Sequence, residues 1–163
     1  RPNYVNNRNN FGNFEADTLV TRKSKHAILV LHERKSKMTF IKKLERKTAA
    51  FVKEKTIETL NKFTRFLKTI TYDNGLENAL HYEVNKALGC KSYFCNPYHS
   101  WEKGSIENVN GLIRRFIPKK TDLANFTQND LDYIQNLINN RPRKSLNYLS
   151  PKIYFNTLWC NST

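Results

Sequence analysis

Residues 14–44 read FEADTLVTRKSKHAILVLHERKSKMTFIKKL, and this stretch decides the fold. It contains three runs typical of strands, 14–21, 26–33 and 38–44, which are joined by two short polar connections rich in Lys and Arg. Connections this short join antiparallel neighbours. The middle run is purely aliphatic over Ala27–Leu31, as expected of a central strand covered on both faces. The stretch predicts a three-stranded antiparallel sheet.

The next part of the chain alternates between helix and strand patterns. Apolar residues at spacings of three and four predict a helix over 47–63. A β-run over 67–73 follows, and then a second helical pattern over 76–87 with Gly89 as its C-terminal glycine. A short strand over 91–94 completes a predicted five-stranded mixed sheet, three strands antiparallel and then two parallel.

The last third of the chain predicts two further helices and a tail. Ser105 is expected to cap a third helix that reaches about Ile117 before Pro118. The Thr127-x-x-Asp130 motif predicts the start of a fourth helix, which ends before a proline at position 142. The fold class is therefore α/β, a layered sheet flanked by helices.

Length and composition favour one soluble domain. The chain has 163 residues, which suits a single domain expected over 14–155, with an extended lead-in at 1–13 and a C-terminal tail at 156–163. No segment resembles a membrane span or a signal peptide. Because the first residue is Arg1 rather than Met, we expect a piece of a longer protein.

The charge balance indicates a polyanionic partner. Lys and Arg number 28 and Asp and Glu number 14, which gives a formal charge of +14. Nucleic acid fits this surplus best, and the dispersed basic residues disfavour a membrane surface. The three cysteines form no metal-binding or disulfide pattern, so a reducing cytoplasm is expected, with Cys90 and Cys95 as core or edge residues. No nucleotide motif predicts a small-molecule cofactor.

In so basic a chain, three acidic residues stand out. Asp17 lies in the first strand, Asp73 ends the fourth strand, and Glu107 lies one turn into the third helix. If the first and fourth strands are neighbours, the two aspartates lie side by side, and a helix packed across the sheet can add Glu107. Three carboxylates at one place favour Mg²⁺, or Mn²⁺ as its substitute, and two ions suit phosphoryl transfer.

Simpler interpretations of these acids stay open. Asp17 could be a surface residue of an edge strand, Asp73 a turn residue before Asn-Gly, and Glu107 a favourable charge at a helix N-terminus. Three other acids lie close enough in sequence to replace members of the triad, namely Glu15, Glu77 and Glu102. The aromatic loop before the third helix offers His99 and Trp101 as stacking contacts to DNA, or as residues that close the core.

Several motifs together resemble one family, the DDE transposases of bacterial insertion sequences, which have a catalytic domain of the retroviral-integrase-core type. The resemblance is closest to the group with N-terminal helix-turn-helix modules. The segments that carry it are GNFEAD (12–17), TYDNG (71–75), NPYHSWEKGSIEN (96–108), NGLIRR (110–115) and NRPRK (140–144). Thirty-three residues separate Asp73 from Glu107, as in these enzymes. The likeness covers most of residues 11–155.

The resemblance implies a ribonuclease-H-like fold, with Asp17, Asp73 and Glu107 as the catalytic and metal-binding triad. It implies hydrolysis at the element's ends followed by attack of the freed 3′-hydroxyl on target DNA. A bacterial, nucleoid-associated location and a homodimer are expected with it. The chain departs from the family pattern at Asn13-Phe14, where His-Trp is expected, and at Lys120, where glycine is expected.

Basic and polar residues near the predicted site are candidate DNA contacts. Asn110 and Arg114 share a helix face with Glu107, at spacings of three and seven. The remaining candidates with side chains able to contact phosphate are Arg115, Lys119, Lys120, Arg141, Arg143 and Lys144. Two other functions stay open: a catalytically inactive nucleic-acid-binding domain, and a ribonuclease-H-like nuclease that cuts without joining.

Overall fold

The computed structural model describes residues 9–95 and 104–162. Five strands form one mixed sheet in the order β3-β2-β1-β4-β5. The strands are β1 (Asn13–Val20), β2 (Ala27–Glu33), β3 (Thr39–Leu44), β4 (Thr69–Tyr72) and β5 (Lys91–Phe94). The pairs β1–β2 and β2–β3 are antiparallel, and β1–β4 and β4–β5 are parallel. The predicted mixed sheet is confirmed.

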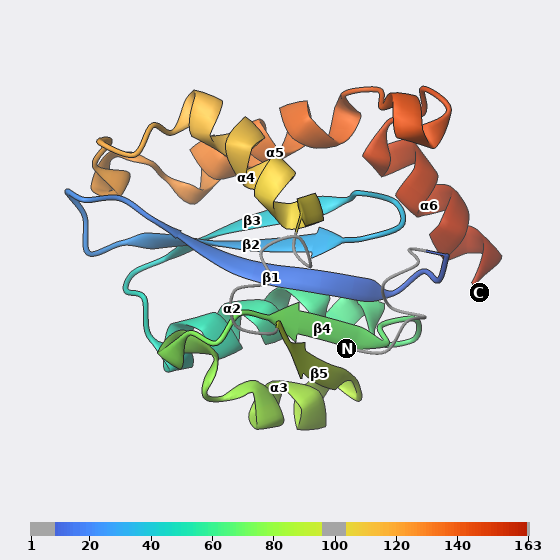
Figure 1. Cartoon of the computed structure of the whole chain (residues 1–163), viewed down its shortest axis with the longest axis horizontal. Helices are drawn as coiled ribbons and strands as arrows, with labels where there is room; N and C mark the ends of the chain where they lie inside the picture. The colour runs from blue at the N-terminus through green and yellow to red at the C-terminus, as the bar shows by residue number, and fades with distance from the viewer. Residues whose placement is uncertain (1–8, 96–103, 163) are drawn as a thin grey trace.

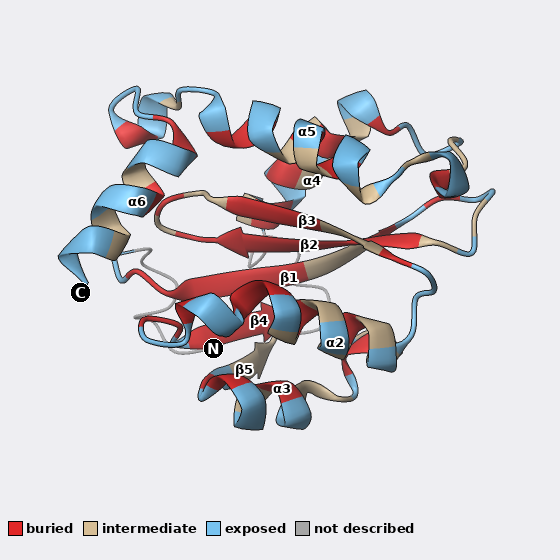
Figure 2. Cartoon of the chain, turned by 180° about the vertical axis from the view of Figure 1, so that it is seen from behind, coloured by how far each residue is buried: buried red, intermediate tan, exposed pale blue. Residues whose placement is uncertain are grey.

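Helices cover both faces of this sheet (Figure 1). On one side lie α2 (Ala49–Leu60) and α3 (His81–Leu88). On the other side lie α4 (Gly104–Phe116) and α5 (Gln128–Asn140). Strand β2 is buried along its whole length, as its apolar sequence predicts, and it lies between the two helical layers (Figure 2).

The two faces of the sheet have separate cores because alternate strand residues point to opposite sides. Phe14, Leu29 and Ile70 belong to the core beneath α2 and α3. Leu19, Val30 and Ile41 belong to the core beneath α4 and α5. The second core also takes the apolar stripes of the two helices, with Ile106, Val109, Ile113, Leu131, Ile134 and Ile138.

Local sequence signals set most of the helix ends. Thr127 and Asp130 form the predicted capping box at the start of α5. Gly89 ends α3 in the left-handed conformation with φ of 65°, which glycine adopts at no steric cost. Ser105 differs from the expectation, because it lies inside the first turn of α4 and its side chain contacts the sheet instead of capping the helix.

The C-terminal residues form a helix rather than an irregular tail. Helix α6 (Pro151–Asn161) begins at the Ser150 cap with proline in its first turn, and it runs across the expected boundary at residue 155. Phe155 is buried among aromatic rings, 5.2 Å from the ring of Phe11 and 5.3 Å from that of Phe63. Trp159 packs on the same cluster. Helix α6 therefore closes one end of the core.

Replacing Phe155 with alanine is expected to lower the free energy of unfolding by about 3–5 kcal/mol, because it opens a cavity in the aromatic cluster. Ile153→Ala on the same helix is the matched control, since Ile153 is 56% exposed, and it is expected to change stability by less than about 0.5 kcal/mol. Urea unfolding followed by circular dichroism measures both. Equal losses would show that α6 contributes helix propensity alone.

Candidate functional site

Asp17 and Asp73 come from neighbouring parallel strands at the centre of the sheet. The register pairs Asn13 with Thr69 and Glu15 with Thr71. Continued by two residues, the same register sets Asp17 level with Asp73, which directly follows β4. Both lie on the sheet face that α4 covers. The interpretation of Asp17 as an edge-strand surface residue is wrong, because β1 is the middle strand.

Uncharged hydrogen-bond donors hold both aspartates. The Asn110 side-chain amide on α4 donates to Asp17 Oδ2 over 2.7 Å, and the backbone N–H of Thr18 donates to Asp17 Oδ1 over 2.9 Å. The Asn78 side-chain amide donates to Asp73 Oδ1 over 2.7 Å, as does the backbone N–H of Gly75 over 3.1 Å. Both side chains are half-buried, so each carboxylate keeps a fixed place and contact with solvent.

Glu107 lies on α4 in its first turn, one turn before the Asn110 that contacts Asp17. Its side chain is exposed. Over residues 9–95 and 104–162, no three His, Cys, Asp or Glu side chains stand close enough together to hold a metal ion. The register of β1 and β4 thus predicts Asp17 and Asp73 as neighbours, and Glu107 lies on the helix whose Asn110 contacts Asp17.

The donor chemistry of the three acids fits a hard divalent cation. All three offer carboxylate oxygens, which are the ligands that Mg²⁺ and Mn²⁺ prefer. The amide of Asn110 already supplies a positively polarised group at the Asp17 oxygen, where a cation would bind. A rotation of the exposed Glu107 side chain would direct a third carboxylate toward the two aspartates. The three side chains thus offer the oxygen ligands that the predicted metal prefers, and the strands and helix that carry them adjoin one another.

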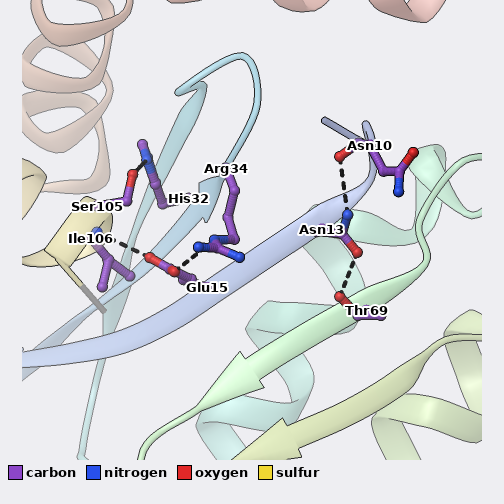
Figure 3. A network of polar contacts seen from close by, with 8 residues as sticks. All are labelled: Asn10, Asn13, Glu15, His32, Arg34, Thr69, Ser105 and Ile106. Carbon is purple, nitrogen blue, oxygen red and sulfur yellow. Dashed lines mark hydrogen bonds and ion pairs between the residues drawn. The ribbon is translucent and has the colours of Figure 1, made fainter. Parts of the chain in front are cut away.

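A buried ion pair joins the strands to α4 just before Glu107 (Figure 3). Arg34 Nε contacts Glu15 Oε1 over 2.9 Å, with Arg34 only 3% exposed and Glu15 fully buried. The backbone N–H of Ile106 donates to the other Glu15 oxygen over 3.1 Å. Glu15 is therefore a structural partner of Arg34 and α4, which makes it unsuited to replace Asp17. Nothing in the basic cluster 34–37 distinguished Arg34 as a buried residue.

A second contact at the start of α4 involves His32, which is 1% exposed on β2 (Figure 3). Its Nε2 lies 2.9 Å from Ser105 Oγ, and its Nδ1 lies 3.0 Å from Thr39 Oγ1. Because Thr39 donates its hydroxyl proton to the Lys37 carbonyl, it can accept from Nδ1–H. The other ring nitrogen, Nε2, is then placed to accept the Ser105 hydroxyl proton. The first turn of α4 is thus tied to β1 and to β2.

Asn13 occupies the position where the family pattern predicts histidine. It is 1% exposed, and its side-chain oxygen accepts the Thr69 hydroxyl proton over 2.8 Å. Its amide donates to the Asn10 carbonyl over 3.0 Å (Figure 3). Asn13 therefore links β1 to β4 in the register that sets Asp17 level with Asp73.

The other proposed substitutes and loop residues have different outcomes. Glu77 is nearly buried and pairs with Lys47 over 2.7 Å, facing away from α4 beside α2. Glu102, His99 and Trp101 lie outside the described residues. Cys90 and Cys95 are buried, and burial raises the pKa of the Cys90 thiol to about 11, so it is an unreactive core residue, as the sequence predicted.

Among the basic candidate DNA contacts, Arg114 lies within the electrostatic reach of Asp17. It donates to the Val20 carbonyl over 2.8 Å. Partial burial lowers the pKa of Arg114, while the negative charge of Asp17 acts in the opposite direction. Burial and then the neighbouring Arg141 likewise lower the pKa of the half-buried Arg143. The remaining candidates are exposed: Arg115, Lys119, Lys120, Arg141 and Lys144.

Comparison of the sequence with known proteins confirms the resemblance. The chain is 44% identical over 155 residues to the transposase for insertion sequence element IS4351 from Bacteroides fragilis, matching 95% of this chain and 48% of that protein. It is 40% identical over 153 residues to transposase InsI for element IS30A from Escherichia coli, matching 93% and 40%. The chain spans about half the length, or less, of these relatives. No protein-family profile matches it.

Comparison of the structure confirms the ribonuclease-H-like fold. The crystal structure of the catalytic core domain of BIV integrase superposes with a TM-score of 0.71 at 17% identity, covering 93% of this chain and 99% of that domain. A chain of the simian T-cell lymphotropic virus intasome gives the same TM-score at 16% identity, covering 88% of this chain and 53% of the other. No helix in the described parts of this chain is long and apolar enough to span a membrane.

Removing one partner of the Glu15–Arg34 pair is expected to destabilise the fold strongly. Arg34→Met leaves a buried carboxylate without its counter-charge, at a cost of about 3–5 kcal/mol in the free energy of unfolding. Combining it with Glu15→Gln, which still offers an oxygen to Ile106, is expected to recover most of the loss.

Lys53→Met is the matched control for this pair. Lys53 contacts Glu83 over 2.6 Å at the surface, and removing that contact is expected to cost less than about 1 kcal/mol. Denaturant unfolding of Arg34→Met, Glu15→Gln, the double variant and Lys53→Met measures the coupling between Glu15 and Arg34. A double variant that is as unstable as the sum of the single variants would contradict the pairing.

Proposed function

We propose that this chain is the catalytic domain of an insertion-sequence transposase, which cleaves the 3′ ends of a DNA element and joins them to target DNA. The two transposase relatives and the integrase-core fold support this function. The observation that supports it is the parallel register of β1 and β4, which sets Asp17 level with Asp73 when continued by two residues, together with the contact of Asp17 to the helix that carries Glu107. Because the relatives are about twice as long, recognition of element ends is expected to need other segments.

Each acidic residue has a distinct role in this proposal. Asp17 and Asp73 would bind Mg²⁺, with Asp17 shared by two ions, and Glu107 would complete the ligand set from α4. Two bound cations would activate the attacking oxygen and stabilise the leaving one. The protein's own contribution is to fix the register of β1 with β4 and the position of the first turn of α4. All three carboxylates would then face the same strand of the bound DNA.

The basic residues around this edge would hold the phosphodiester backbone. Arg114 is the nearest, because it lies within the electrostatic reach of Asp17. The exposed Arg115, Lys119 and Lys120 continue from the end of α4, and Arg141, Arg143 and Lys144 follow α5. Joining two element ends calls for two active sites, which favours a homodimer, and a DNA substrate would bring the protein to the bacterial nucleoid.

A nuclease that cuts without joining is the second candidate, since the same fold and metal chemistry serve both. Transposase relatives at 40–44% identity favour joining. An inactive DNA-binding domain is disfavoured, because nothing in DNA binding alone calls for two level aspartates on central strands. Strand-transfer products would distinguish a transposase from a nuclease that only cuts. A metal-dependent reaction of either kind would distinguish both from an inactive DNA-binding domain.

The first test uses a branched DNA that mimics the strand-transfer product, with Mn²⁺ or Mg²⁺. We expect wild-type protein to resolve the branch, and Asp73→Asn to slow this by about a thousandfold or more, since several kcal/mol of transition-state stabilisation is lost. Asparagine retains an oxygen that accepts from Gly75 and Asn78, so the fold is expected to survive.

The control for this experiment is Glu83→Gln, which neutralises an exposed acid on α3 that pairs with Lys53. It is expected to react at the wild-type rate. Wild-type protein that binds the branched DNA tightly and never cuts it, in either metal, would refute the catalytic function and support the inactive binding domain.

Asn110 serves a second test, because its amide contacts Asp17 directly. If Asn110 positions Asp17, Asn110→Ala is expected to slow the reaction by about tenfold or more and to leave the salt dependence of DNA binding unchanged. If Asn110 contacts phosphate instead, binding weakens and the rate at saturating DNA is kept. Single-turnover rates and binding titrations at several salt concentrations distinguish these outcomes.

A further inference from the structure

A cavity lies away from the carboxylates, near the beginning of β1. It has a volume of about 410 Å³ and lies between the β2–β3 turn, the loop around η5 (Lys144–Leu146) and α6. Figures 1 and 2 both have this turn beside the segment that joins α5 to α6. The cavity is lined by Asn9, Arg34, Lys35, Lys37, Ser145, Leu146, Asn147, Leu149 and Tyr154.

The lining of this cavity is cationic. Lys35 and Lys37 are half-buried, and none of the described residues that line the cavity is acidic. Arg34 contributes little charge here, because Glu15 balances it in the interior. Two partly buried ammonium groups beside hydroxyl and amide side chains form a site suited to an oxyanion such as a phosphodiester.

A second, smaller cavity of about 40 Å³ lies beside the start of α4. It is lined by Lys37 and Arg143 on one side and by Ser105 and Asn108 on the other. Ser105 and Asn108 flank Glu107 in sequence. The two cavities share Lys37, which therefore lies between the first turn of α4 and the loop before α6.

The spacing along β1 gives the distance from the larger cavity to Asp17. The backbone N–H of Arg34 donates to the Asn13 carbonyl, so the cavity adjoins the beginning of β1. Asp17 is four residues further along, about 13 Å away at roughly 3.3 Å per residue. A DNA backbone that runs from the carboxylates to this cavity would therefore meet it at a phosphate other than the reacting one.

We infer that this groove, formed by the two cavities, binds the DNA backbone at a phosphate on one side of the reacting phosphate. The inference rests on the proposed function for the reaction at the carboxylates. Lys35, Lys37 and Arg143 supply the positive charge, and Ser145, Asn147 and Tyr154 supply hydrogen-bonding groups. The groove reads no base, so it sets the path of the DNA and leaves the choice of sequence to other contacts.

The test pairs protein variants with chemically altered DNA, and it measures binding in Ca²⁺ or without metal, so that it does not depend on the reaction. Lys35→Gln with Lys37→Gln keeps side-chain length and removes two charges. We expect the slope of log binding constant against log salt to become shallower by about one to two units. Lys62→Gln with Lys86→Gln is the charge-matched control, because both lysines are exposed on the α2 and α3 side.

A second arm locates the contact on the DNA. A single neutral methylphosphonate is placed at each position from one to eight nucleotides from the branch joint. We expect weaker binding by wild-type protein when the neutral group lies at one or two particular positions of this scan, and no such loss for the Lys35→Gln, Lys37→Gln variant. The same position-dependent loss in both proteins would overturn the inference, as would equal salt slopes for the groove variant and the control.

This outcome is independent of the test of function. Wild-type protein that resolves branched DNA, with a groove variant that binds as the control does, would refute the groove and keep the transposase. Wild-type protein that never reacts, with position-dependent binding lost in the groove variant, would refute the transposase and keep the groove. Circular dichroism melts of both double variants verify that the fold is intact.

Discussion

Glu15 and Arg34 form an ion pair in the interior of the protein, where either charge alone would cost several kcal/mol. The pair is effective because of its position: Glu15 lies on the middle strand, Arg34 follows β2, and the second Glu15 oxygen receives an N–H from α4. The residues two places before and after Glu15 extend the same pattern, since Asn13 bonds to β4 and Asp17 bonds to α4 again. One face of β1 therefore sets the mutual positions of all the elements that carry the candidate site.

Much of this arrangement follows from local sequence. The aliphatic run Ala27–Leu31, the capping box at Thr127 and Asp130, and the terminal Gly89 determine elements by short-range rules, and each was predicted. What the sequence alone did not reveal depends on tertiary partners. Arg34 lies in the same basic segment as Lys35 and Lys37, so its local sequence does not distinguish it from a solvent-exposed residue. Its burial is favourable because Glu15, nineteen positions earlier, pairs with it. Helix α6 was missed because its apolar residues Phe155 and Trp159 pack against Phe11 and Phe63, which are distant in sequence.

The candidate site is also consistent with a protein that folds without metal. Asp17 and Asp73 each accept hydrogen bonds from neutral amides, so neither carboxylate depends on a cation to be stable in place. Asp17 and Asp73 are half-buried. The negative charge of the fully buried Glu15, on the same strand as Asp17, is already balanced by Arg34. A structural carboxylate, Glu15, and a candidate metal ligand, Asp17, therefore lie on the same strand face two residues apart. This proximity explains why the spacing of acidic residues alone could not distinguish Glu15 from Asp17.

The parallel pairing of β1 with β4 has a consequence for how the chain acquires its shape. Asn13 and Thr69 meet across 56 positions, whereas the β1–β2 and β2–β3 pairs need only short turns. During synthesis the meander can form early, but its open β1 edge stays unpaired until β4 emerges, and α4 and α6 follow later still. Non-local contacts of this kind slow folding and leave strand edges exposed in the meantime. A nascent chain therefore carries Asp17 long before β4 and α4 are present, so the candidate site can assemble only when nearly the whole domain has left the ribosome.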